Sequence, residues 1–167
     1  MMKILLALLF IITLFVNSPA QQQQSVPRFE EYAATVYKGK RAPVNVKSSR
    51  LARNFRTMLR DGAKEGVNFA GHYTLASWGC GTACMQVAII DAKTGTVYFP
   101  EQLFTFSVLY WGDNDDALQF KPSSRLLIMS GFPPNEANGE EPKSGLHYYE
   151  WTGERLKLVK LIEKSRE

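Results

Sequence analysis

The chain has 167 residues, of which 45% are hydrophobic and 22% are charged, and its formal net charge at pH 7 is +4. These are ordinary values for a globular protein with one hydrophobic core. The positive charge is mild and the basic residues are spread along the chain, so we expect no nucleic-acid partner.

The N-terminus has the pattern of a secretory signal peptide. Lys3 precedes an apolar run over residues 4–16, which is shorter than the roughly 20 residues that a membrane span needs. Ser18 and Ala20 place small residues at the −3 and −1 positions of a cleavage site. We therefore expect a signal peptide over residues 1–20 and a mature protein that is periplasmic or secreted, with no membrane span after signal cleavage.

The rest of the chain divides into a short leader and one globular unit. Residues 21–27 begin with a glutamine tract, which predicts a disordered leader. Residues 28–167 are expected to form a single globular α+β domain, because turn signals recur along them without a long linker.

One amphipathic helix is predicted from Ser48 to Gly62. Ser48 or Ser49 can cap its N-terminus, and Gly62 can end it. Apolar residues spaced by four, three and one predict a single stripe that packs on a sheet; they are Leu51, Phe55, Met58 and Leu59. Arginines fall mainly off this stripe and should face solvent; they are Arg50, Arg53, Arg56 and Arg60.

Strand patterns follow the helix. The predicted segments are 72–78, 86–92, 96–99, 103–110, 118–121, 125–130, 146–151 and 155–162. Several are joined by turns of two or three residues, such as the one that contains Gly95, and such turns permit only antiparallel neighbours. The sequence therefore predicts an α+β fold: an antiparallel β-meander sheet of six or seven strands with the N-terminal amphipathic helix on one face.

Three stretches together resemble a known group. They are Asn68-Phe69-Ala70-Gly71-His72-Tyr73, Trp78-Gly79-Cys80-Gly81-Thr82-x-Cys84 and Asp91-x-x-Thr94-Gly95-x-Val97. With the later stretch from Tyr149 to Gly153, they are similar to an uncharacterised group of small exported bacterial proteins. The resemblance covers roughly residues 65–160. It implies an exported bacterial protein and brings no activity with it.

The only two cysteines, Cys80 and Cys84, lie in a glycine-rich stretch. On a straight strand their Cα atoms would be roughly 13 Å apart, too far for a disulfide. Gly79 and Gly81 make a turn between them easy, and export favours oxidation. We therefore expect a disulfide that closes a short loop.

Other chemistry for these cysteines stays open at this point. Cys80 could act as a nucleophile or a redox thiol, which makes a cysteine-dependent enzyme or thiol redox protein the alternative function. A zinc set would need both cysteines with His72 and His147, a spacing that is not a recognised pattern. We expect no metal, no cofactor and no catalytic residue.

The leading hypothesis is a binding or interaction module, because loops fixed on a rigid sheet commonly carry recognition. The partner would be a protein or small-molecule ligand of the cell envelope. The candidate binding residues are Asn68, Phe69, His72, Trp78, Gly79, Gly81 and Thr82.

Overall fold

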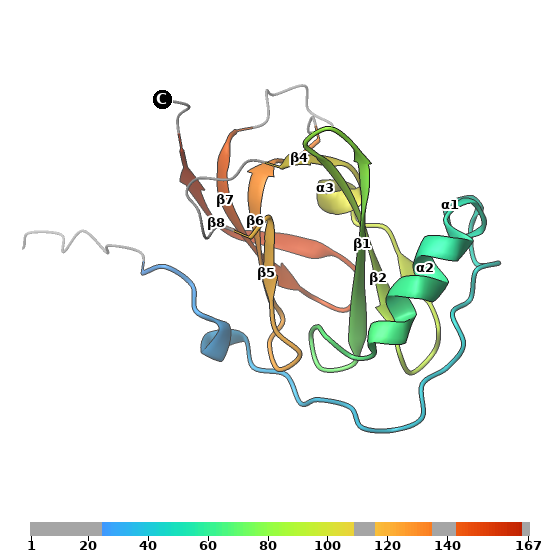
Figure 1. Cartoon of the computed structure of the whole chain (residues 1–167). Helices are drawn as coiled ribbons and strands as arrows, with labels where there is room; N and C mark the ends of the chain where they lie inside the picture. Colours follow the sequence, from blue (N-terminus) through green and yellow to red (C-terminus); the bar gives the residue numbers. More distant parts are fainter. Residues whose placement is uncertain (1–24, 109–115, 135–142, 165–167) are drawn as a thin grey trace, which may run out of the picture.

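The computed structural model describes residues 25–108, 116–134 and 143–164 (Figure 1). The predicted signal peptide and most of the predicted leader lie outside these residues. The last two residues of the predicted strand 103–110 lie outside them as well.

The described residues form a mixed structure dominated by one antiparallel sheet of eight strands. The strands are β1 (Tyr73–Gly81), β2 (Cys84–Asp91), β3 (Val97–Tyr98), β4 (Phe106–Val108), β5 (Leu118–Phe120), β6 (Leu126–Phe132), β7 (Gly145–Trp151) and β8 (Leu156–Glu163). Their order is β1-β2-β4-β6-β7-β8, with β3 also on β2 and β5 also on β6. The predicted antiparallel sheet is confirmed, but it has eight strands rather than six or seven, because the short strands β3 and β5 pair beside β2 and β6; β1 and β8 stand at the two ends of the order.

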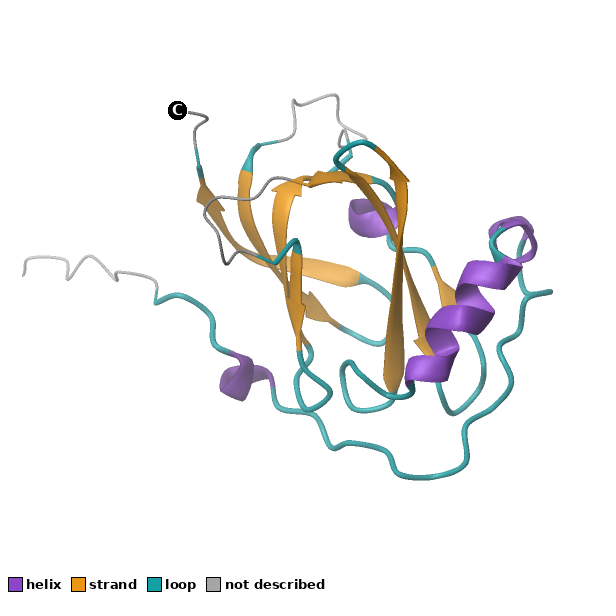
Figure 2. Ribbon diagram, in the orientation of Figure 1, coloured by secondary structure: helices purple, strands orange, loops and turns teal. Residues whose placement is uncertain are grey.

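The sheet is strongly curved (Figure 2), and one large hydrophobic core lies on its inner face. Because side chains alternate between the faces of a strand, every second residue of each long strand points inward. The inner set includes Leu75, Val87, Met129, Tyr149 and Trp151, all buried in one cluster. Strands from both ends of the sheet contribute to this cluster, so the curvature joins them.

A second, smaller core lies on the outer face of β1 and β2. Two short helices pack there, α1 (Arg50–Asn54) and α2 (Arg56–Gly62). The Ser49 side chain accepts a hydrogen bond from Ala52 N at 3.0 Å, as an N-cap should. Ala52 and Leu59 are fully buried against Ala76 and Ile90.

The expectation of one continuous helix and one stripe needs correction. The helix is interrupted at Phe55, whose φ of −98° and ψ of 19° are not helical. The change of direction turns Met58 outward, leaving it 46% exposed, while Ala52 is buried instead. The four arginines are exposed as expected.

The predicted strand 103–110 is also corrected. Its first residues belong to a single helical turn, α3 (Glu101–Phe104), which follows Pro100. Leu103 is buried in the large core, and only Phe106–Val108 pairs as a strand. The turn lies between the two places where β3 and β4 pair with β2.

Residues 25–49 run along one end of the sheet as an arm (Figure 1). It contains a short 3-10 helix (Phe29–Tyr32) near its start and a turn at residues 46–47, and no strand. Backbone hydrogen bonds fix the arm to successive loops, from Ala34 N to Ser123 O, from Tyr37 N to Gly71 O and from Asn45 N to Gly95 O. The β1–β2 turn lies at the opposite end.

Candidate functional site

The cysteines and glycines of the predicted loop lie at the tip of the β1–β2 hairpin, where the stretch from Trp78 to Cys84 turns the chain. Trp78 pairs with Gln86, and Gly79 pairs with Met85. The register then shifts, so that Gly81 pairs with Cys84 and Cys80 lies in a bulge. Thr82 and Ala83 make the turn.

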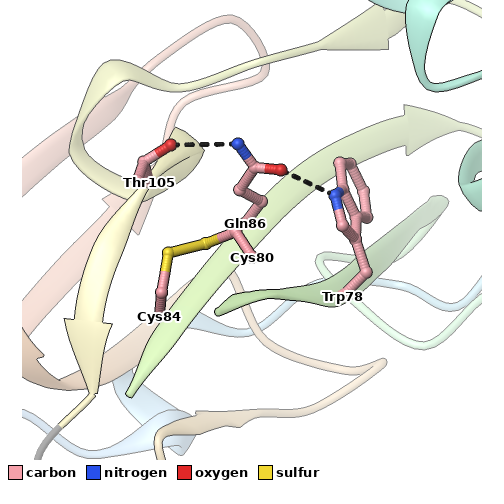
Figure 3. Close-up of a disulfide and its surroundings, with 5 residues drawn as sticks. All are labelled: Trp78, Cys80, Cys84, Gln86 and Thr105. Atoms are coloured by element: carbon pink, nitrogen blue, oxygen red, sulfur yellow. Dashed lines mark hydrogen bonds between the residues drawn. A yellow bond between two sulfur atoms is a disulfide. The ribbon is translucent and has the colours of Figure 1, made fainter. Parts of the chain in front are cut away.

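A disulfide joins Cys80 to Cys84 across this turn (Figure 3). Their Cα atoms are 5.1 Å apart, within the range that a disulfide needs and far less than on a straight strand. The turn requires left-handed backbone, with φ of +140° at Gly81 and +52° at Ala83. The predicted disulfide is therefore present, and it depends on the turn that the glycine allows.

A row of polar contacts braces the outer face of the hairpin. Trp78 Nε1 donates to Gln86 Oε1 at 2.8 Å, and Gln86 Nε2 donates to Thr105 Oγ1 at 3.1 Å (Figure 3). The Trp78 ring lies 5.2 Å from the Phe55 ring, centroid to centroid. These contacts hold the base of the tip on both neighbouring elements.

β1 changes character halfway along its length. Residues from Tyr73 to Ala76 are buried, whereas Ser77, Gly79, Cys80 and Gly81 are exposed. Trp78 is half-buried between them. The tip is therefore a solvent-exposed surface on a strand whose other half is core.

Three of the candidate binding residues lie elsewhere, and two of them are Phe69 and Asn68. Phe69 is fully buried in the large core, so the prediction that it lies on the binding surface is wrong. An aromatic residue near a glycine fits an exposed or a buried position equally well, so the sequence did not indicate this burial. Asn68 bonds the β1 backbone, its Oδ1 accepting from Leu75 N at 2.7 Å. Both precede β1, at the end away from the disulfide.

His72 lies at that same far end of the hairpin. It immediately precedes β1, so a strand of residues separates it from the cysteines, roughly 26 Å at 3.3 Å per residue. Burial, and then the positive charge of Lys93, lower the pKa of His72, against the opposing effect of Asp91. The predicted patch is thus divided between two ends of the sheet.

The alternative cysteine chemistry finds little support at this tip. Neither Cys80 nor Cys84 is a free thiol, which a nucleophile or a zinc ligand would have to be. His147, the other histidine, is buried on β7. Among the described residues no group of three or more histidine, cysteine or carboxylate side chains could hold a metal ion.

A cleft of about 470 Å³ lies away from the tip, between the arm and α2. Arg41, Arg60 and Lys64 line it together with apolar residues of the arm and with Ile90 of β2. Arg41 donates to the Ala63 carbonyl oxygen at 2.6 Å, and Lys64 pairs with Asp61 at 2.6 Å. Two of its three cations are therefore engaged within the chain.

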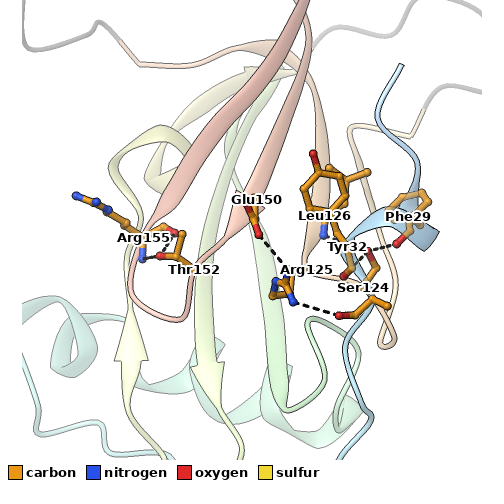
Figure 4. A network of polar contacts seen from close by, with 9 residues as sticks. Phe29, Tyr32, Ser124, Arg125, Leu126, Glu150, Thr152 and Arg155 are labelled. Carbon is orange, nitrogen blue, oxygen red and sulfur yellow. Dashed lines mark hydrogen bonds and ion pairs between the residues drawn. The ribbon is translucent and has the colours of Figure 1, made fainter. Parts of the chain in front are cut away.

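At the end of the sheet that lies away from the hairpin tip, polar contacts attach the arm to the sheet (Figure 4). The Ser124 hydroxyl donates to the Phe29 carbonyl oxygen at 2.7 Å, and Arg125 donates to the Ala33 carbonyl oxygen at 3.1 Å. Arg125 also pairs with Glu150 at 3.1 Å. These contacts attach the arm to the turn between β5 and β6.

No helix among the described residues is long and apolar enough to cross a membrane. Comparison of the chain with protein-family models, with curated protein sequences and with solved structures gives no match. Function must therefore be argued from the hairpin itself.

Proposed function

We propose that this protein is an exported binding module, periplasmic or secreted, whose partner contacts the tip of the β1–β2 hairpin. One observation carries the proposal: the exposed half of β1 is fixed by the Cys80–Cys84 disulfide and by the contacts of Trp78. A surface that is both exposed and held in shape loses little conformational entropy on binding. The partner is a protein or small-molecule ligand of the cell envelope.

The disulfide at the tip supports the part of this proposal that places the protein outside the cytoplasm. Disulfides persist in oxidising compartments and are rare where thiols are kept reduced. The signal-peptide pattern of residues 1–20 points to the same compartments. N-terminal sequencing of protein taken from the envelope fraction should begin at Gln21; a sequence that begins at Met1 would contradict cleavage.

Photo-cross-linking tests the binding surface. A photoreactive amino acid is placed at Thr82, which is exposed in the turn, and in a separate variant at Glu154, which is exposed between β7 and β8. The Tyr73 hydroxyl donates to the Gly153 carbonyl oxygen at 3.4 Å, so Glu154 marks the end of β1 that lies away from the tip. It is therefore the matched control.

After illumination in the cell envelope, we expect adducts at Thr82 that are absent or much weaker at Glu154, detected as a mass increase of the protein. Equal labelling of the two positions, or no adduct at Thr82, would count against a partner at the tip. Counting free thiols by alkylation and intact mass tests the alternative. Two labelled thiols would favour cysteine chemistry, and none would oppose it.

A further inference from the structure

The free edge of β1 presents backbone groups in a regular pattern. In an antiparallel pair, successive residues direct their N–H and C=O groups alternately toward the neighbouring strand and away from it. The His72 carbonyl oxygen accepts from Ala92 N at 2.8 Å, so even-numbered residues here face β2. The odd-numbered residues of β1 therefore face away from the sheet.

The first two outward positions are paired within the chain. Tyr73 N donates to the Phe69 carbonyl oxygen at 2.9 Å, and Phe69 N donates back to Tyr73 at 3.0 Å. Leu75 N donates to Asn68 Oδ1 at 2.7 Å, and Asn68 Nδ2 donates to the Leu75 carbonyl oxygen at 3.1 Å. The side-chain amide of Asn68 thus makes the two hydrogen bonds with Leu75 that the backbone of a neighbouring strand would otherwise make.

The next two outward positions, Ser77 and Gly79, are open. Both are exposed, and the described residues make no hydrogen bond to their outward N–H and C=O groups. The bulge at Cys80 ends the regular edge. Two donors and two acceptors therefore remain in strand geometry along roughly 10 Å.

The residue types of this edge favour the approach of another backbone. Gly79 is not in the left-handed region, and a Cβ atom built on it would meet no atom within 4 Å. Gly79 borders the bulge at Cys80, a usual setting for a strand glycine, and no side chain there hinders the approach of another backbone to the edge. Natural edges are commonly blocked by lysine or proline. β8, the other edge strand, carries Lys157 and Lys160, whereas Ser77–Gly81 carries neither residue type.

We infer that the open edge at Ser77 and Gly79 binds an extended peptide segment of a partner protein, which adds to the sheet beside β1. This inference rests on the proposed function and specifies the partner. The segment exchanges four backbone hydrogen bonds with Ser77 and Gly79. Its residue opposite Trp78 lies on the outer face against the half-buried indole, as cross-strand neighbours do.

A second copy of the chain is a poorer occupant. A stable protein–protein interface buries roughly 800 Å² on each partner, and two outward residues on an edge of roughly 10 Å supply a small part of that. A short flexible segment needs only the backbone groups and the neighbouring indole. The disulfide keeps those groups in strand geometry before binding.

Peptides selected from a displayed random heptapeptide library against the wild-type protein provide the probe. Their affinity is then measured for Gly79→Pro, which removes the outward N–H, and for Gly79→Ala, which keeps it. The inward hydrogen bonds to β2 involve other residues, so proline at this edge position spares the β1–β2 ladder. Because Gly79→Ala keeps the N–H that Gly79→Pro removes, we expect Gly79→Pro to bind the peptides about tenfold or more weakly than Gly79→Ala does.

A second measurement does not depend on the proline variant folding. The selected peptide is N-methylated on one set of alternate residues and then on the other set. Strand addition requires one version to lose binding and the other to keep it, with the Ser77 and Gly79 amides protected from hydrogen exchange.

Three results would overturn the inference: no peptide is selected, both methylated versions bind equally, or the two amides become protected through dimerisation without peptide. Adducts at Thr82 in the cross-linking experiment would, in each case, leave the broader proposal of a partner at the tip intact.

Discussion

At the scale of single residues, the disulfide is the feature with the clearest energetic consequence. It closes a loop with a sequence separation of 4 between its cysteines. Restricting the unfolded chain over so short a loop stabilises the folded state by about 2 kcal/mol. That is modest for the whole protein, and its larger effect is on the shape of the tip.

Replacing both cysteines, as Cys80→Ser with Cys84→Ser, should lower the free energy of unfolding by about 2 kcal/mol. Urea unfolding of the two proteins measures the difference. Wild-type protein in reductant should lose about as much, and the double variant should not respond to reductant. Unchanged stability of the double variant would show that the turn needs no covalent closure.

His147 gives the protein a pH-dependent stability. It is 3% exposed, and burial lowers the pKa of its imidazole, with weaker opposition from nearby backbone carbonyls. The unfolded chain then takes up a proton at a higher pH than the folded chain does. Stability is therefore complete above pH about 6.5 and falls as the pH drops below it.

The variant His147→Phe should flatten the dependence of unfolding free energy on pH between about 7 and 5, since phenylalanine does not titrate. Its ring can keep the stacking on Tyr149, whose centroid is 6.0 Å away. Urea unfolding at a series of pH values measures this. His72→Gln is the comparison: the pKa of His72, the only other histidine, is lowered in the same direction, but His72 is more exposed, so its replacement should flatten the pH dependence less. An equal slope in His147→Phe and wild type would assign the pH dependence elsewhere.

At the scale of elements, the contact of α2 with β1 depends on small residues. A Cβ atom at Gly62 would lie 2.4 Å from the Ala76 Cβ atom, so the helix can approach the strand only because position 62 is glycine. Sequence periodicity assigned contacts to large residues such as Met58. It could not detect that Ala52 and Gly62 set the approach, since small residues give no periodic signal.

Gly62→Ala should destabilise the protein by about 1–2 kcal/mol, because overpacking exceeds the gain in helix propensity. Adding Ala76→Gly makes room for the new methyl group, so part of the loss should return. A double-mutant cycle by urea unfolding measures this coupling. Purely additive effects of the two changes would show that α2 simply shifts away.

The sequence predicted elements well where local chemistry decides them. The turn at Gly95, with φ of +78°, and the disulfide turn follow from glycine and cysteine positions alone. The prediction of Phe69 as a surface residue is wrong because its burial depends on how distant strands curve around it, and the prediction of Leu103 in a strand is wrong because the chain forms a helical turn there. A run of alternating apolar residues near Leu103 fits a strand equally well, and only the tertiary structure selects a helical turn.

At the scale of the whole molecule, the two ends of the sheet differ. The arm of residues 25–49 covers one end, and the exposed tip lies at the other. The arm can pack closely against Gly71 because this residue has no side chain. Its φ is +85°, and a Cβ atom there would lie 2.7 Å from the Thr35 carbonyl oxygen. The contact between Gly71 and the arm could not be predicted from the sequence, because the arm has no periodic apolar residues.

Gly71→Ala should loosen the arm, since alanine is strained in this backbone region by about 1–2 kcal/mol and would contact Thr35. Trypsin should then cut faster after Lys38 and Lys40, which are exposed on the arm. Limited proteolysis with mass spectrometry measures the rates. Gly79→Ala should leave them unchanged, because nothing lies near that position. Equal rates in Gly71→Ala and wild type would show that Gly71 does not control the arm.

The arm also sets an order of assembly. Phe29 and its partner Ser124 are 95 residues apart, and Ala33 and Arg125 are 92 residues apart. The first part of the arm therefore leaves the ribosome early but cannot make these two hydrogen bonds until the turn between β5 and β6 has formed, whereas Tyr37 and Asn45 bond Gly71 and Gly95, which are synthesised earlier. Contacts of such long sequence separation form late and slowly. The residues that begin the arm, although synthesised before the sheet, are thus ordered late, and they close the structure only after β5 and β6 have formed.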